Sequence, residues 1–233
     1  MSIPAISAYP LPRGEPENRV DWKVQPRRAV LLIHDMQLYF LNKYDAAAEP
    51  VPTLVKHIAE LRDQCHALGI PVVYTAQPTE QPPEDRALLT DFWGPGLSEP
   101  RHKGQEAIIT PLAPAPQDIV LTKWRYSAFY RSNLKTMLGE QGRDQLIITG
   151  IYAHIGCMTT ALDAFMNDIQ PFFVTDATAD FSAEDHAMAI QYVSRRCGVS
   201  VNTRRLQGWL AEDDQLVTAT PITQTQKNHA QAA

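Results

Sequence analysis

The stretch that decides the fold is QLIITGIYAHIGCMTTALDAF, residues 145–165. Its first part, residues 145–152, is almost continuously apolar, which is typical of a strand covered on both faces in a parallel sheet. Its second part has the pattern of a helix, so a strand turns into a helix around Gly156 and Cys157. An α/β hydrolase often carries its nucleophile on such a turn, which makes Cys157 the first candidate.

Similar apolar runs recur along the chain and alternate with helical patterns. Between the first two, apolar residues repeat at helical spacing from Val51 to Leu68, and Gly69 follows where a C-terminal cap belongs. A helix also follows Ser132, and another begins at Ser182 with a sequence like a capping box. The other apolar runs are residues 29–35, 71–77, 118–123, 171–176 and 199–203.

This alternation predicts a three-layer, Rossmann-like, doubly wound α/β fold, with about six mostly parallel strands and helices on both faces. Residues 79–116 interrupt it, because they are rich in proline and predict an elaborated loop. We expect one catalytic domain over residues 1–210, beginning with a proline-rich extended arm. Residues 211–233 are polar without an apolar period and predict a tail or linker, with no carrier-protein domain.

Composition narrows the class of protein. The chain has 233 residues, 44% of them hydrophobic, which suits one well-packed domain. The formal net charge of −5 argues against nucleic acid or an acidic membrane surface as partner. No apolar run approaches the ~20 residues of a membrane span. Three scattered cysteines form neither a disulfide framework nor a zinc motif, so we expect a reducing cytoplasm.

Polar residues close several of the predicted strands. Asp35 ends the first run, Gln77 the second and Lys123 the third, with Arg125 and Tyr126 just beyond. In this fold class, ligands bind beyond the carboxyl ends of the strands. Any one of these residues could simply mark where the chain meets water. Together, on one edge of the sheet, they predict a site.

Other features argue against a metal or nucleotide. His34 precedes Asp35 and should point to the opposite face of its strand, as a hydrogen-bonded structural histidine. His154 and His186 have no metal-ligand spacing, so we expect no metal. The chain contains neither GxGxxG nor GxxxxGK[ST], so we expect no nucleotide cofactor.

Several long blocks closely resemble the isochorismatases of catecholate-siderophore biosynthesis. The resemblance covers roughly residues 2–205, and the phenazine-pathway hydrolases that act on aminodeoxyisochorismate resemble the chain almost as closely. The blocks are LLIHDMQLYF (31–40), PVVYTAQP (71–78), EDRALLTDFWGPG (84–96), LTKWRYSAFYRS (121–132), DQLIITGIYAHIGCMTTALDAFMNDIQPF (144–172) and DATADFS (176–182).

More distantly, the chain is similar to nicotinamidases, whose triad is Asp, Lys and Cys. Asp35 and Lys123 match the first two members, and the nucleophile should stand six residues after Gly150. That position is Gly156, and Cys157 is one residue too late, about 100° further round if the helix has begun. We therefore expect Cys157 to be a packing residue and the reaction to avoid a thioester.

The resemblance implies hydrolysis of the enolpyruvyl vinyl ether of isochorismate to 2,3-dihydro-2,3-dihydroxybenzoate and pyruvate. Asp35 would act as general acid and protonate the terminal vinyl carbon, after which water adds. The carboxyl must then hold a proton near neutral pH, and our hypothesis is that the substrate's carboxylates offset Lys123. Gly156 would leave room for the substrate, because no enzyme nucleophile is needed.

The same resemblance implies the substrate-binding residues and a non-proline cis peptide near Ile151–Tyr152. Gln77 would bind the ring hydroxyls or water, and Arg86, with Lys123, would bind carboxylates. An apolar lining would exclude water from the cationic intermediate, although any of these aromatic residues could be ordinary core. Its members would be Phe40, Trp93, Tyr126 and Tyr152.

Three alternatives stay open at this point. The first is aminodeoxyisochorismate hydrolysis, although the run GCMTT at 156–160 favours the siderophore type. The second is a Cys-dependent amidase that uses Cys157. The third is a non-catalytic module that docks nonribosomal peptide synthetase partners. Relatives also imply a homodimer.

Overall fold

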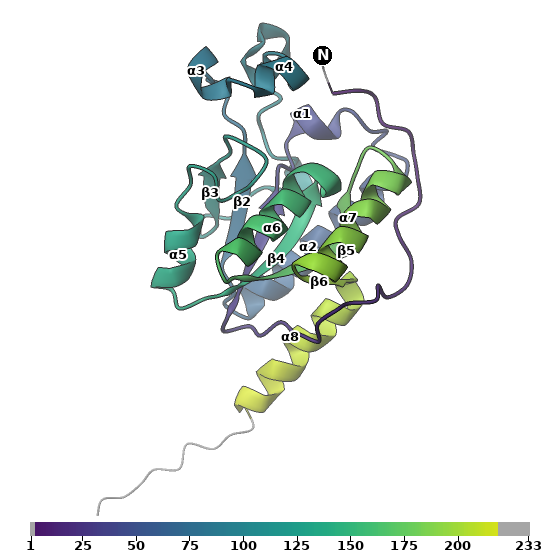
Figure 1. The fold of residues 1–233 in the computed structure, drawn as a ribbon, viewed down its shortest axis with the longest axis vertical. Helices are drawn as coiled ribbons and strands as arrows, with labels where there is room; N and C mark the ends of the chain where they lie inside the picture. Colours follow the sequence, from purple (N-terminus) through teal and green to yellow (C-terminus); the bar gives the residue numbers. More distant parts are fainter. Residues whose placement is uncertain (1–2, 219–233) are drawn as a thin grey trace, which may run out of the picture.

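The computed structural model describes residues 3–218, with side chains through residue 212. Six strands form one sheet in the order β3-β2-β1-β4-β5-β6, and every neighbouring pair is parallel (Figure 1). The predicted doubly wound fold is confirmed. The strands are β1 (Ala29–His34), β2 (Val72–Ala76), β3 (Ile119–Thr122), β4 (Gln145–Ile151), β5 (Gln170–Ala179) and β6 (Val199–Val201).

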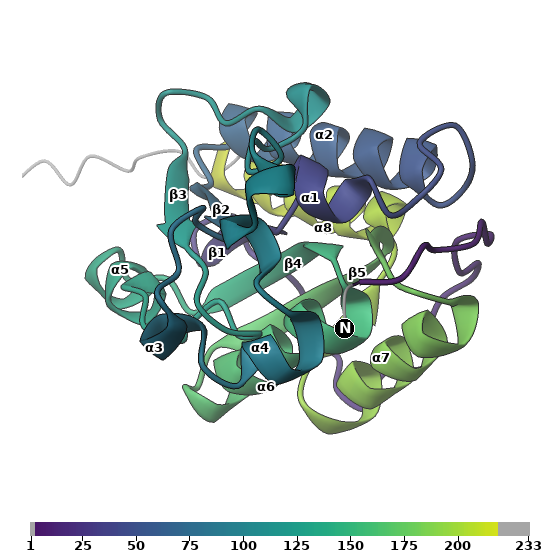
Figure 2. The same ribbon diagram turned by 90° about the horizontal axis from the view of Figure 1, so that it is seen from above.

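Helices cover both faces of the sheet (Figure 2). Strand β1 shows why its sequence is apolar throughout, because alternate side chains enter two different cores. Leu31 and Ile33 pack in the core that includes α2 and α8, whereas Val30 and Leu32 pack in the core of the opposite face. The helices are α2 (Val51–Ala67) and α8 (Thr203–Thr218) on one face, with α5 (Leu134–Glu140), α6 (Met158–Met166) and α7 (Ala183–Arg196) on the other.

The predicted helix ends are confirmed where the structure describes them. The side chain of Ser182 accepts a hydrogen bond from the backbone N–H of Asp185 at 3.0 Å, which caps α7. Arg195 and Arg196 occupy the last turn of α7, where positive charge suits the helix dipole. Gly69 follows α2 with a φ of 65°.

Between β2 and β3 the chain forms short helical pieces instead of one regular crossover, as the prolines predict. They include α3 (Pro83–Arg86) and α4 (Leu89–Trp93), followed by the 3₁₀ turns η1 (Gly96–Ser98), η2 (Pro100–His102) and η3 (Thr110–Leu112). Figure 1 shows α3 and α4 above the ends of the strands, with α4 close to the N-terminal arm and α1 (Leu38–Leu41) below it. These short helical pieces cover the carboxyl edge of the sheet.

The first part of the predicted tail or linker, residues 211–218, is helical, because α8 continues to Thr218. A polar sequence can still be helical: AEDDQLVT contains neither Gly nor Pro, and its Ala, Glu, Gln and Leu have good helix propensity. The rest of the predicted tail, residues 219–233, lies outside the described residues. Within the described residues no helix has the length and apolar character to cross a membrane.

Candidate active site

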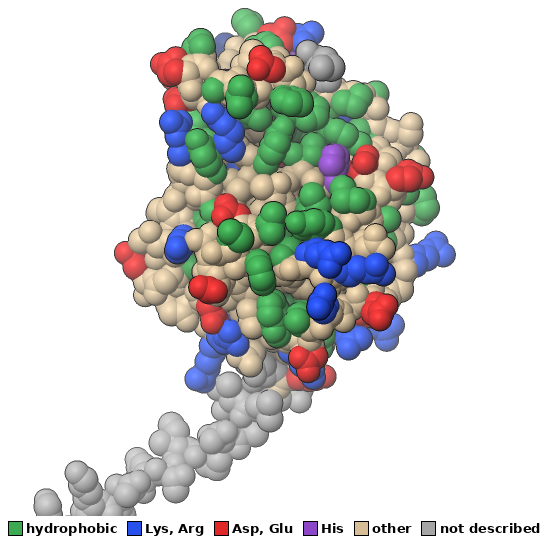
Figure 3. Space-filling model, in the orientation of Figure 1, with side chains coloured by type: hydrophobic (Ala, Val, Ile, Leu, Met, Phe, Trp, Pro, Cys, Tyr) green, Lys and Arg blue, Asp and Glu red, His purple; other side chains and the backbone are tan. Residues whose placement is uncertain are grey.

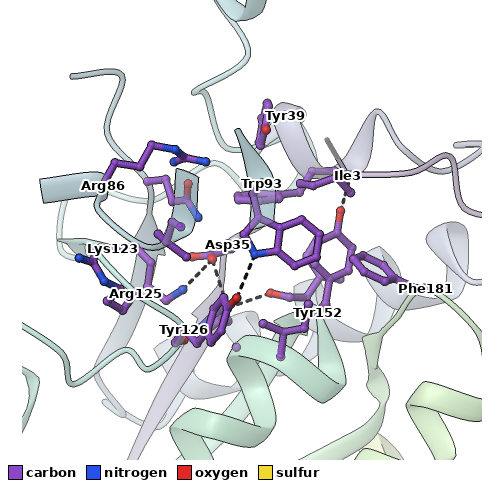
Figure 4. Close-up of a pocket in the computed structure, with 17 residues that line it drawn as sticks. Ile3, Asp35, Tyr39, Arg86, Trp93, Lys123, Arg125, Tyr126, Tyr152 and Phe181 are labelled. Atoms are coloured by element: carbon purple, nitrogen blue, oxygen red, sulfur yellow. Dashed lines mark hydrogen bonds and ion pairs between the residues drawn. The ribbon is translucent and has the colours of Figure 1, made fainter. Parts of the chain in front are cut away.

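One cavity of about 530 Å³, counting the part open to solvent, lies at the carboxyl edge of the sheet. It sits beyond β1 and β4, the neighbours between which the strand order reverses, and this is where doubly wound folds bind ligands. Figure 4 shows the side chains that converge there from separate elements. All nine predicted site residues line it: Asp35, Phe40, Gln77, Arg86, Trp93, Lys123, Tyr126, Tyr152 and Gly156.

Residues in or just after three adjacent strands hold the carboxylate of Asp35. The residue as a whole is only 5% exposed. Its Oδ1 accepts a hydrogen bond from Thr75 Oγ1 of β2 at 2.7 Å. Its Oδ2 accepts one from Lys123 Nζ, just after β3, at 3.0 Å (Figure 4). Each oxygen therefore has one fixed partner, and the ammonium that balances the negative charge is buried beside it.

Strand alternation predicted that the side chain of His34 faces away from that of Asp35, and this prediction is wrong. His34 Nδ1 lies 3.6 Å from Asp35 Oδ2, and the ring lines the cavity. The reason is the backbone of Asp35, whose φ of 51° is left-handed and ends the extended geometry on which alternation depends. The expectation of a hydrogen-bonded histidine holds, because Nδ1 lies 2.8 Å from the carbonyl oxygen of Ile151.

Gly156 makes room for this imidazole. A Cβ at position 156 would lie 2.2 Å from His34 Cε1 and 2.8 Å from Nε2, far inside contact distance. The resemblance implied that Gly156 leaves room for the substrate, whereas in the structure the side chain of His34 lies in this space. The turn that carries Gly156 is η4 (Ala153–Cys157), a π-helical turn, and the Ile151–Tyr152 peptide before it is cis, as the resemblance implied.

Cys157 is completely buried and points away from the cavity into the core of the other face. Burial raises the pKa of its thiol well above the ordinary value, with nearby Asp35 acting in the same direction. A thiol that stays protonated is a poor nucleophile. Among the described residues that line the cavity, there is no Cys, Ser or Thr.

The side chain of Gln77 is free to face the cavity because Gln37 holds its backbone. Gln37 Oε1 accepts from the backbone N–H of Gln77 at 2.8 Å, and Gln37 Nε2 donates to its carbonyl oxygen at 2.9 Å. Gln37 is completely buried and also donates to the carbonyl of Glu106 at 2.7 Å. These bonds fix the backbone of Gln77 at the rim of the cavity and leave its side-chain amide free to bind a ligand.

Aromatic side chains form one wall of the cavity (Figure 4). Tyr152 packs against Phe181 with ring centroids 4.5 Å apart and against Phe40 at 5.9 Å. Trp93 Nε1 donates to the hydroxyl of Tyr126 at 2.9 Å, which ties α4 to the loop after β3. This wall excludes water while leaving its polar atoms satisfied.

Two guanidinium groups line the opposite side. Arg86 is 4% exposed, and no described carboxylate forms an ion pair with it. Arg125 donates to the carbonyl oxygens of Asp85 and Trp124 at 2.6 and 2.7 Å. Burial lowers the pKa of Arg86, and the charge of Arg125 acts in the same direction. The two cations therefore favour an anionic ligand.

The structure adds lining residues that the sequence did not identify as part of the site. Ile3 comes from the N-terminal arm and Phe181 from just after β5, and both lie beside Tyr152 in Figure 4. The resemblance covers both positions, but neither residue has the polar character that pointed to the other site residues. The others are His34, Tyr39, Leu89, Ile151 and Ile155, and Arg125, which the sequence placed just beyond the third strand, lines the cavity as well.

Acid should destabilise the fold through two buried histidines. Burial lowers the pKa of His34 and of His186 to about 4, so unfolding lets both bind protons below their unfolded value of about 6.5. Above about pH 6.5 both histidines are neutral in the folded and the unfolded chain, so the free energy of unfolding has its full value. As the pH falls from 6.5 towards 4, only the unfolded chain binds these protons, and the free energy of unfolding decreases. We expect each to remove about 1.4 kcal/mol of unfolding free energy per pH unit across that window.

Urea unfolding at several pH values measures this slope. His186 lies outside the cavity, so His186→Gln should reduce the slope by about one proton without changing the site. An identical slope in the variant would contradict the assignment.

The fold and the cavity together define an α/β enzyme whose site pairs a buried acid with a lysine at the switch point of the sheet. Sequence comparison gives the family. The profile described as "Isochorismatase domain" matches residues 29–205, and the chain belongs to the isochorismatase family.

Three relatives illustrate the likeness. The chain is 59% identical over 208 residues to "Isochorismatase" of Bacillus subtilis, covering 88% of this chain and 66% of that protein. It is 55% identical to "Enterobactin synthase component B" of Escherichia coli, covering 88% of this chain and 72% of that one. It is 47% identical to "Phenazine biosynthesis protein PhzD1" of Pseudomonas aeruginosa, covering 86% and 96% respectively. The chain thus spans about two thirds of the length of the first two.

Proposed function

We propose that the protein hydrolyses isochorismate to 2,3-dihydro-2,3-dihydroxybenzoate and pyruvate. The observation that carries this proposal is a buried acid, Asp35, in a cavity that has unpaired guanidinium groups but no described Cys, Ser or Thr. Such a site can bind a dianion and deliver a proton, and it offers no side chain for acyl transfer. The name of the Bacillus subtilis relative, 59% identical, supports the same reaction.

In the first step, Asp35 donates its proton to the terminal CH₂ carbon of the enolpyruvyl group. The carbon–carbon π electrons form the new C–H bond, which leaves an oxocarbenium ion next to the ether oxygen. Thr75 and Lys123 hold the carboxyl in place while the charge moves. The substrate's carboxylates weaken the hold of Lys123 on the negative charge of Asp35, so the acid becomes protonated in the complex.

In the second step, water adds to the oxocarbenium carbon. The resulting hemiketal then breaks its bond to the ring oxygen, and this oxygen leaves as the ring hydroxyl after taking up a proton. One water is consumed: the proton that the added water loses restores Asp35 to its acid form, and the proton of the hemiketal hydroxyl passes to the ring oxygen as the carbonyl of pyruvate forms. Gln77 binds the ring hydroxyls or the attacking water, and the aromatic wall around Tyr152 limits other water.

Pyruvate release tests the proposal directly. Purified protein is mixed with isochorismate, and pyruvate is measured by coupling to lactate dehydrogenase, with the dihydrodiol identified by chromatography. We expect stoichiometric release of both products without added cofactor. Isochorismate that stays intact would overturn the proposal.

A second candidate is hydrolysis of 2-amino-2-deoxyisochorismate, supported by the 47% identity to the phenazine protein across 96% of its length. The reacting ether is the same, and only the neighbouring ring substituent differs. Measuring kcat/KM for both substrates decides between them, and we expect the higher value for isochorismate.

Arg86→Gln is expected to weaken substrate binding without weakening the fold. A hydrogen bond to a charged group contributes about 1.5–3 kcal/mol, so KM should rise roughly 10- to 150-fold. Because Arg86 is buried without a carboxylate partner, the melting temperature should stay level or rise. A variant with unchanged KM would contradict the assigned role.

We further propose a cytoplasmic homodimer that acts with nonribosomal peptide synthetase partners. Large apolar side chains that remain exposed on α4, α6 and α7 would suit such contacts, and Figure 3 shows hydrophobic side chains over α6 and α7. All three cysteines are free and buried, which fits a reducing compartment. Light scattering tests the dimer. The exposed side chains are Leu88, Phe92, Phe165, Met166, Met188 and Tyr192.

A further inference from the structure

Among the described residues, the buried guanidinium of Arg86 donates hydrogen bonds to neutral groups only. Its Nη1 donates to Gln81 Oε1 at 2.6 Å, and its Nε donates to the carbonyl oxygen of Gly94. Burying a cation without an opposite charge is unfavourable. The arrangement makes physical sense if the opposite charge arrives with the ligand.

The acid nearest to Arg86 in sequence is held elsewhere. The carboxylate of Asp85 accepts a hydrogen bond from Arg131 Nη1 at 2.7 Å, and the Asp85 carbonyl accepts from Arg125 Nη1 at 2.6 Å. Two other arginines thus hold Asp85. The charge of Arg86 remains uncompensated as a result.

Gly96 completes the surroundings of the guanidinium. A Cβ at position 96 would lie 2.5 Å from both Nη1 and Nη2 of Arg86, so only glycine leaves this space open. We call Gln81, Gly94 and Gly96 the neutral cradle. Gln81 and Gly94 accept hydrogen bonds from Arg86, Gly96 leaves room for it, and none of the three brings a negative charge.

The amide of Gln81 can have only one orientation. A guanidinium only donates hydrogen bonds, so the amide oxygen must face Arg86 and the NH₂ group must face elsewhere. Gln81 is 7% exposed, and its Nε2 has no acceptor among the described residues. A buried donor without an acceptor is itself unfavourable and points to a missing partner.

We propose that Gln81 is a positioning residue for Arg86 and a second donor to the same anion. It fixes the guanidinium without neutralising it, and its free NH₂ joins Arg86 in binding a carboxylate of the substrate. This inference rests on the proposed function, which supplies the dianionic substrate.

Gln81→Glu tests the proposal, because the change keeps the length of the side chain and its contact with Arg86. The new carboxylate pairs with Arg86, cancels its charge and removes the NH₂ donor. We expect the KM for isochorismate to rise roughly 10- to 100-fold, with a much smaller change in kcat. A purely structural role predicts the opposite, an unchanged KM with equal or higher thermal stability, and that result would overturn the proposal.

A matched control separates this effect from added charge alone. Thr90 is exposed on α4 of the same segment, so Thr90→Glu brings the same charge without touching Arg86. Its KM should stay within about twofold of wild type. An equal rise in KM in both variants would overturn the proposal.

The failure of this inference can be distinguished from failure of the proposed function. Wild-type protein that releases no pyruvate from isochorismate would end the proposed function. Calorimetric titration of wild type and Gln81→Glu with isochorismate still decides the role of Gln81, because it measures binding without turnover. Weaker binding in the variant supports the proposal, and equal binding overturns it.

Discussion

Asp35→Asn should lower kcat for isochorismate hydrolysis by about 10²- to 10⁴-fold or more. General acid catalysis is worth that range, and an amide of the same shape has no acidic proton to give to carbon. The one amide oxygen of Asn can still accept from Lys123, and the hydroxyl of Thr75 can turn to accept from the NH₂ group, so the site should keep its geometry. Steady-state kinetics with pyruvate release, together with a melting curve, measure both effects.

Asp118→Asn is the matched control for this variant. Asp118 also carries a buried carboxylate, which accepts a hydrogen bond from the backbone of Ala115 at 2.8 Å and pairs with His66 at 2.7 Å, outside the cavity. Its kcat should stay close to that of wild type. An Asp35→Asn enzyme within about threefold of wild type would remove Asp35 from the role of acid, since the expected range begins far above that.

Gly156→Ala should damage both stability and activity. The new methyl group would collide with the imidazole of His34, whose Nδ1 lies 2.8 Å from the carbonyl oxygen of Ile151. Overpacking of this kind costs about 1–3 kcal/mol. The displaced ring would press on Asp35, 3.6 Å away, and a shift of about 1 Å in the acid can reduce kcat/KM roughly 100-fold.

Gly139→Ala controls for the change from Gly to Ala itself. Gly139 lies in α5, and a Cβ there would meet nothing within 4 Å. This variant should gain about 0.5–1 kcal/mol from helix propensity and keep full activity. Urea unfolding and kcat/KM compare the two variants. Wild-type stability and activity in Gly156→Ala would show that His34 does not need the space.

The sheet could be predicted from the sequence because its strands are buried on both faces. An unbroken apolar run such as AVLLIH at 29–34 fits only a strand with a core on each side, and the polar residue that ends each run marks the carboxyl edge. Asp35, Gln77 and Lys123 were therefore predictable as neighbours from topology. Arg86 and Trp93 were not, because they lie in the irregular segment and came from the resemblance alone.

The remaining features depend on local geometry that no periodic pattern encodes. His34 turns towards Asp35 because of one left-handed residue, and strand alternation predicted the opposite direction. Gln81 matters through a single contact with Arg86 inside a segment of short helices. Ile3 reaches the cavity from an arm without regular secondary structure. Contacts of this kind require the folded chain.

Hydrolysis of isochorismate in H₂¹⁸O, with mass analysis of the dihydrodiol, tests the central claim most directly. If Asp35 protonates the vinyl carbon and water adds to the oxocarbenium carbon, the ring oxygen never leaves the ring. The dihydrodiol should then contain no ¹⁸O, and the label should enter pyruvate. A labelled ring hydroxyl would show that water attacks the ring carbon, and it would contradict the account.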